Sequence, residues 1–181
     1  MSASVAPAMR DMRTRRAHRA AVARTLIDGP LASAPEAAGV DWRQLGELPG
    51  WCLWPAAPRL RLVRVVGALF AAPGMRLWID GRRLEVARAL IGRATLARVM
   101  TCHALPMQAP AVPPAGDLQR LFDSTGRAVL LGSLAATWMR GVAAPLLPPV
   151  DARTALCPAA IARPLVDQAL ALVAEIPAEA A

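Results

Sequence analysis

Residues 51–103 of the 181-residue chain read WCLWPAAPRLRLVRVVGALFAAPGMRLWIDGRRLEVARALIGRATLARVMTCH, and this stretch decides the fold. Apolar side chains recur in it every three or four residues, which is the spacing of one face of an α-helix. The pattern runs three times and predicts three helices. Short turns separate them, at Pro73-Gly74, Asp80-Gly81 and Gly92. Helices joined by short turns pack as antiparallel neighbours, so the stretch predicts a compact helical cluster.

The first helix of this cluster carries three arginines in its opening turns: Arg59, Arg61 and Arg64. Pro58 suits the first turn of a helix, where its missing N–H leaves no hydrogen bond unmade. The helix is expected to stop at Ala71–Gly74. Positive charge at a helix N-terminus is disfavoured by roughly a few tenths of a kcal/mol. The arginines therefore either lie in water or are compensated by an acidic group, in the chain or in a partner protein.

The second and third helices have local start and stop signals. Asp80 predicts an N-cap for a helix over 81–91, and Gly92 predicts its C-cap. A third helix is expected over 93–102. Arg82 and Arg83 begin the second helix, and a short connection would bring them near the arginines of the first.

The rest of the chain predicts a basic, partly disordered arm and a single helical domain. No alternation of period two persists, so the fold class is all-α, a bundle of about five to seven helices without a substantial sheet. Proline-rich segments, such as residues 104–116, connect the helices. The expected parts are the arm over 1–40, the domain over 41–177 with its central cluster over 51–103 and C-terminal helices over 117–140 and 151–176, and a tail over 178–181.

Three polar or proline positions predict how the C-terminal helices begin. Asp117 is the expected N-cap of the long helix over 117–140. Asp151 is expected to cap a short helix that ends at Leu156. Pro164 fits the first position of the last helix, where proline is common.

The composition is basic. The chain has 21 arginines, no lysine and 13 acidic residues, which gives a formal net charge of +8. A basic balance suits nucleic acid, an anionic membrane surface or an acidic protein. The charges are spread along the chain, which argues against nucleic acid. No apolar run reaches the roughly 18 residues that a membrane span needs.

The sequence contains no recognisable active site. It has no paired carboxylates for acid–base catalysis, no phosphate-binding glycine loop and no nucleophile motif. Cys52, Cys102 and Cys157 are far apart, and His18 and His103 do not complete a zinc spacing. The thiols are interpreted as free cysteines of a reducing compartment. We therefore expect no enzyme activity, metal, cofactor or small-molecule substrate.

Two tryptophans stand just before the first helix, framed by prolines. Trp51 and Trp54 either cover that helix as part of the core or form an exposed aromatic contact for a partner. The arginines offer a second candidate contact. Rim charges raise association rates and make binding salt-sensitive, so reversing Arg61 and Arg64 to glutamate is expected to weaken partner binding without unfolding the chain.

Residues 45–103 resemble the SctK family of type III secretion accessory proteins, which includes the YscK, PscK, OrgA and MxiK branches. The resembling motifs are LPGWCLWP, RLRLVRVVGALFAAPGMRLWIDGRRLEVARALIG and TLARVM. In proteins of this family, a leucine- and proline-containing start is followed by a helix with a Gly-Ala-Leu core, an apolar turn, and a second helix that ends in glycine.

This resemblance implies a non-enzymatic adaptor in the bacterial cytoplasm, peripheral to the inner membrane through the secretion apparatus. Such a protein links the SctD-like inner-membrane ring protein to the SctQ-like protein of the sorting platform. Two other hypotheses stand beside it. One is a basic helical protein that binds nucleic acid or has a regulatory role. Arg13, Arg15, Arg16 and Arg19 would contact the phosphates of a nucleic acid. The other is an enzyme without a recognisable motif.

Overall fold

The structure is a computed structural model that describes Ala17, Ala20, Arg24 and residues 45–78, 80–102, 114–150 and 155–176. In these residues the chain forms six α-helices and several short 3₁₀-helices, and no strand. The predicted all-α class with five to seven helices is confirmed. None of these helices combines the length and the apolar character that a membrane crossing requires.

The chain divides into two compact units, and each is described by itself. The first contains Met1–Pro55 and Ala136–Leu146. Its described elements are the 3₁₀-helices η3 (Leu45–Glu47), η4 (Gly50–Leu53) and η6 (Ala144–Leu146) and the helix α6 (Thr137–Ala143). Ala17, Ala20 and Arg24 of the expected arm are helical and exposed. The other residues of the arm lie outside the described residues, as do residues 41–44 of the expected domain, residues 104–113 of the expected linker and the expected tail.

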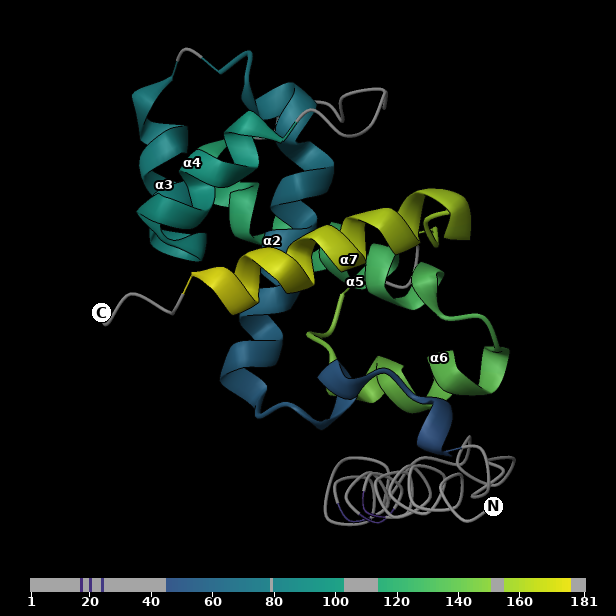
Figure 1. The fold of residues 1–181 in the computed structure, drawn as a ribbon. Coiled ribbons are helices and arrows are strands. Elements are labelled where there is room, and N and C mark those ends of the chain that lie inside the picture. Colours follow the sequence, from purple (N-terminus) through teal and green to yellow (C-terminus); the bar gives the residue numbers. More distant parts are fainter. Residues whose placement is uncertain are drawn as a thin grey trace, which may run out of the picture. The chain divides into compact units, whose positions relative to one another are not determined.

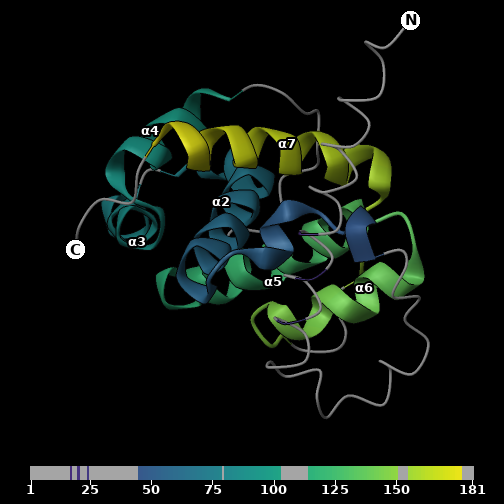
Figure 2. The same ribbon diagram turned by 60° about the horizontal axis from the view of Figure 1, so that its bottom comes forward.

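The second unit is built on two helices, α2 (Ala56–Met75) and α5 (Leu118–Ser133), which cross in its centre (Figure 1). Helix α7 (Ala159–Glu175) packs against both, and α3 (Gly81–Ile91) and α4 (Arg93–Thr101) lie near its C-terminal end (Figure 2). The core consists of apolar side chains from α2, α5 and α7. Burial of each large one contributes about 1.5–3 kcal/mol. They include Val63, Val66, Phe122, Val129, Leu165 and Leu172.

Two glycines let α2 and α5 approach to backbone distance. A Cβ atom added to Gly67 would lie 2.7 Å from the Cα of Phe122 and would overlap its carbonyl oxygen. A Cβ atom added to Gly126 would lie 2.8 Å from the carbonyl carbon of Val63 and would overlap its oxygen. The contact is reciprocal, since each helix supplies one glycine and one backbone segment. The closeness of this crossing depends on the absence of both side chains.

The predicted caps of α3 are confirmed. The Asp80 carboxylate accepts a hydrogen bond of 2.9 Å from the backbone N–H of Arg82, as an N-cap does. Gly92 ends the helix with a φ of 85°, in the left-handed region that glycine adopts without strain. Helix α4 follows at once, as expected, and ends at Thr101.

Two proline predictions are wrong. Helix α2 continues past Pro73 to Met75, and α7 begins at Ala159, so Pro164 lies inside it. A proline inside a helix removes one hydrogen bond. In both places burial offsets that loss, because the last turn of α2 buries Met75 and the added turn of α7 buries Ala162, each fully.

The single helix expected over 117–140 is also wrong. Helix α5 ends at Ser133, where Leu134 adopts an extended conformation and is buried, and α6 begins at Thr137. The boundary between the two units falls within this break. The Asp117 side chain makes no capping hydrogen bond, because its backbone belongs to a 3₁₀-turn, η5 (Ala115–Asp117). Of the expected helix over 151–156, residues 151–154 lie outside the described residues and residues 155–156 are not helical.

Candidate functional site

Arg61 joins three helices of the second unit. Its Nη2 donates a hydrogen bond of 2.5 Å to the carbonyl oxygen of Ile176, the residue that caps the C-terminus of α7. The same nitrogen lies 3.4 Å from the hydroxyl oxygen of Thr95, a fully buried residue of α4. A cation at a helix C-terminus satisfies a free carbonyl and is stabilised by the macrodipole. Arg61 therefore fixes the end of α7 against α2 and α4.

Arg64 also has its partner inside the chain. Its Nε lies 3.1 Å from a carboxylate oxygen of Asp123 on α5, and the two side chains are only 20% and 15% exposed. Asp123 is thus the acidic group that compensates one of the three arginines. Arg59 is half-buried and is engaged as well. The interpretation as arginines in water is wrong for Arg61 and Arg64. Both arginines join helices, so the substitution of Arg61 and Arg64 by glutamate is no longer expected to leave the fold intact.

The expected proximity of the two arginine groups stays a prediction. Arg61 contacts Thr95 of α4, and Arg82 is the second residue of α3.

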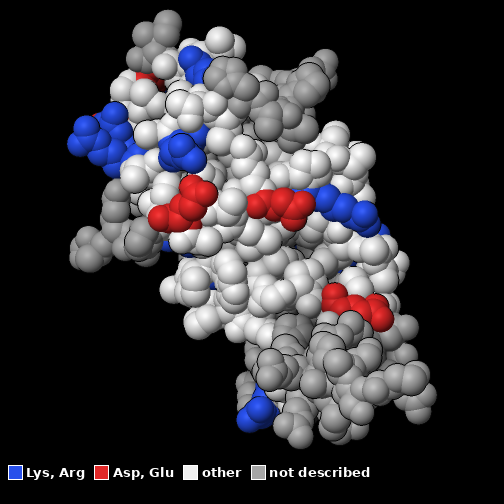
Figure 3. All heavy atoms as spheres, in the orientation of Figure 1, with Lys and Arg blue, Asp and Glu red and all other residues white. Residues whose placement is uncertain are grey.

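A group of arginines remains on the surface of α3 and α4, here called the α3–α4 arginine face. Five arginines stand there against two acidic residues of the same segment, Asp80 and Glu85. Its members are Arg82, Arg83, Arg88, Arg93 and Arg98, of which all but the half-buried Arg83 are exposed. Figure 3 shows arginine atoms gathered over this side of the unit.

Acidic neighbours moderate the charge of the α3–α4 arginine face. Nε of Arg83 lies 3.7 Å from Asp80, Arg88 pairs with Glu85, and Arg98 lies 3.5 Å from Glu175 of α7. The last two pairs are well exposed and contribute little to stability, as surface ion pairs do. The face therefore presents mixed charge with an excess of positive groups.

The tryptophans differ in their placement. Trp51 lies in η4 and is 2% exposed, so it is a buried residue and not an exposed aromatic contact. Trp54 is half-buried, and its backbone N–H donates to the carbonyl of Trp51 at 3.2 Å. Neither tryptophan forms an exposed aromatic patch on the first unit, to which both belong.

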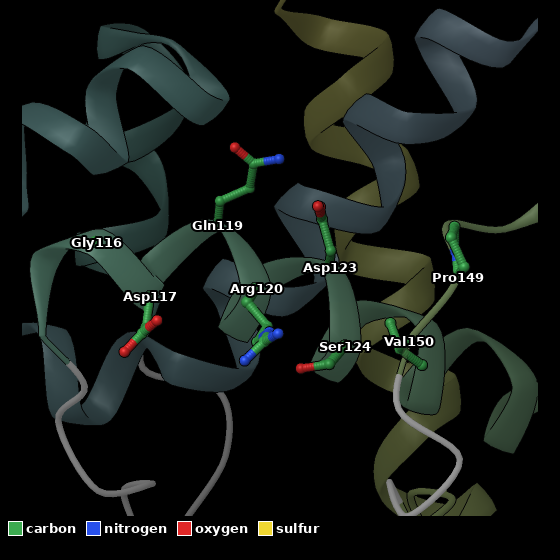
Figure 4. Close-up of a pocket in the computed structure, with 8 residues that line it drawn as sticks. All are labelled: Gly116, Asp117, Gln119, Arg120, Asp123, Ser124, Pro149 and Val150. Atoms are coloured by element: carbon green, nitrogen blue, oxygen red, sulfur yellow. The ribbon is translucent and has the colours of Figure 1, made fainter.

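An open, polar pocket of about 640 Å³ lies along the N-terminal half of α5, a feature that the sequence analysis did not identify. Figure 4 shows Arg120 and Ser124 turned to one side of the helix and Asp123 to the other. The sequence feature that could have indicated this pocket is the polar face of residues 117–124, DLQRLFDS. The remaining lining residues are Gly116, Asp117, Gln119, Pro149 and Val150.

The chemistry of this pocket does not point to catalysis. The Ser124 hydroxyl donates to the carbonyl of Leu121 at 3.2 Å, and Asp123 is paired with Arg64, so neither acts as an activated group. The far wall is held by Arg127, whose Nη1 donates to the carbonyls of Leu147 and Pro148. Burial lowers the pKa of Arg127.

The three cysteines are free thiols. Cys52 and Cys157 are buried, and Cys102 is half-buried. Burial raises the pKa of Cys157, so less of it is thiolate near neutral pH. In the part of the chain that the structure describes, no three His, Cys, Asp or Glu residues are grouped to hold a metal ion.

We expect Cys102 to react first with iodoacetamide at pH 7.5, and Cys157 to react about tenfold more slowly or less, because a buried thiol with a raised pKa supplies little thiolate. The rate of Cys157 should rise as the pH increases toward 9. Peptide mapping by mass spectrometry after timed quenching measures both rates. Faster modification of Cys157 than of Cys102 would contradict the placement of the two thiols.

We compared the chain with protein-family models, curated proteins and solved structures, and none of them matches it.

Proposed function

We propose that this protein is a non-enzymatic adaptor of a bacterial type III secretion system. In this role it links an SctD-like protein of the inner-membrane ring to an SctQ-like protein of the sorting platform, on the cytoplasmic side. The observation that carries the proposal is the α3–α4 arginine face, which lies within the segment that resembles the SctK family. An exposed, charged helix pair is a surface suited to protein contacts.

The charge pattern of this face favours a protein partner over nucleic acid. Three of its five arginines already lie beside carboxylates, namely Arg83, Arg88 and Arg98. Carboxylates within the face would repel a phosphate backbone, whereas a protein surface can place acidic and basic groups opposite both signs. The second candidate function, nucleic-acid binding, depends on arginines of the N-terminal arm, most of which lie outside the described residues.

The test reverses two charges of the α3–α4 arginine face. Arg82 is the second residue of α3 and Arg93 is the first of α4, so glutamate at either position agrees with the helix macrodipole and should not unfold the chain. In the Arg82→Glu/Arg93→Glu variant we expect affinity for the SctD-like cytoplasmic domain or the SctQ-like protein to fall about tenfold or more. Calorimetry or a pull-down at low salt measures it.

The matched control is Arg120→Glu/Arg163→Glu, which makes the same change in net charge at exposed positions on α5 and α7. We expect it to bind as the unchanged protein does. If neither protein is bound by the unchanged chain, while DNA is bound with a steep salt dependence, the adaptor role is wrong and the nucleic-acid function takes its place.

A further inference from the structure

The turn between α2 and α3 contains two buried hydrogen-bond donors that have no acceptor. These are the indole N–H of Trp78, whose side chain is 9% exposed, and the Nε–H of Arg83. A buried donor without an acceptor is costly and rare in folded proteins, so each instance requires an explanation. Here two of them occur within six residues of the chain.

Asp80, the acidic residue of this turn, does not complete the Arg83 donor. One carboxylate oxygen of Asp80 accepts from the Arg82 backbone N–H at 2.9 Å. The other lies 3.7 Å from Nε of Arg83, which is beyond hydrogen-bond range. An additional acceptor is therefore needed at this turn.

The residue directly before Trp78 carries the most exposed large apolar side chain among the described residues. Leu77 is 75% exposed, whereas the other side chain of this kind, Leu156, is 45% exposed. Arg82, two residues after Asp80, is also exposed and adds a positive charge. The turn thus combines an apolar anchor, positive charge and unfilled donors at one end of the α3–α4 arginine face.

We propose that the turn formed by Leu77, Trp78 and the start of α3 docks an acidic segment of a protein partner that also carries apolar side chains. Leu77 packs against the apolar side chains of that segment. Its carboxylates accept from Trp78 and Arg83 once the two side chains rotate on docking, since both donor atoms are buried in the free protein. The inference rests on the proposed function only in taking a protein as the partner.

This partner class fits better than a membrane or a free anion. Asp80 and Glu85 of the same segment would repel an anionic lipid surface, whereas a protein can place basic groups opposite them. Free phosphate would leave Leu77 in water. Two donors beside an exposed leucine match a segment in which acidic and apolar residues alternate.

The first experiment needs no identified partner. An acetylated octapeptide of glutamate and leucine is added to the ¹⁵N-labelled full chain, and the indole N–H resonances are followed by NMR. The Trp78→Phe variant, which keeps an aromatic ring but lacks the donor, identifies the Trp78 signal. We expect this signal to move downfield when the peptide is added. It should return to its original position when salt is added to about 0.5 M, because salt screens the charges of the peptide. No movement of the Trp78 signal overturns the inference, whatever the proposed partners do.

The second experiment uses the SctD-like and SctQ-like proteins with Leu77→Ser and its matched control Leu156→Ser. Leu77→Ser should weaken binding about tenfold while Leu156→Ser leaves it unchanged. Equal binding by both variants, when the unchanged chain binds, overturns the docking turn and leaves the adaptor role standing. Failure of the unchanged chain to bind either protein refutes the adaptor role, and the peptide experiment then decides the docking turn. Binding of the chain to phosphatidylglycerol vesicles, lost in Leu77→Ser without any peptide response, would assign the turn to a membrane instead.

Discussion

Gly126→Ala will destabilise the protein by about 3 kcal/mol or more, and Gly67→Ala will do the same, because each new methyl group would overlap the backbone of the opposite helix. A side chain in the way could rotate, but a carbonyl group in the middle of a helix moves only with the helix itself. We therefore expect α2 and α5 to separate and the core between them to loosen. Urea unfolding followed by circular dichroism measures the loss.

The matched control for these substitutions is Gly81→Ala. Gly81 is the first residue of α3, and a Cβ atom there would meet nothing within 4 Å. Alanine at this position should be neutral or stabilise the protein by about 0.5 kcal/mol. If Gly126→Ala unfolds at the same urea concentration as Gly81→Ala, the two helices do not cross at backbone distance.

The second large effect is expected from Arg61→Glu combined with Arg64→Glu. A carboxylate at position 61 would face the carbonyl oxygen of Ile176, and one at position 64 would face Asp123. Both changes replace an attractive contact by repulsion in a half-buried place, so we expect a loss of about 3 kcal/mol or more. Thermal or urea unfolding of the pure protein tests this directly, without any partner.

Arg120→Glu/Arg163→Glu is the control here, because it makes the same change in charge at exposed sites and should retain the stability of the unchanged protein. Restoring the pair in the opposite order, with Arg64→Asp and Asp123→Arg, should recover part of the loss. If the Arg61→Glu/Arg64→Glu variant is as stable as the control, these arginines do not hold the helices together, and the surface role expected from the sequence regains its basis.

Local signals explain which parts of the fold could be predicted from the sequence. Asp80 and Gly92 act within one turn of the chain, so the bounds of α3 followed from the residue types alone. Pro73 and Pro164 are local signals too, but they were overridden. Burial of Met75 and Ala162 is a property of the folded chain, and no pattern near the prolines reports it.

The contacts of the arginines show the same limit more sharply. Arg64 meets a residue 59 positions away and Arg61 one that is 115 positions away. Helical spacing identified the two residues as a pair on one face, which is correct, but it could not state what that face contacts. The unfilled donors of Trp78 and Arg83 were equally hidden, because their lack of an acceptor is a property of the folded turn.

The division of the chain has a consequence for its synthesis and dissection. The polypeptide passes between the two units after Pro55, after Ala135 and after Leu146, so each unit is assembled from two separate segments. On the ribosome, the first unit must wait for residues 136–146, by which time most of the second has already emerged. A stop codon anywhere between residues 56 and 146 therefore deprives both units of a part, whereas deletion of residues 1–55 retains both segments of the second unit, joined by residues 136–146.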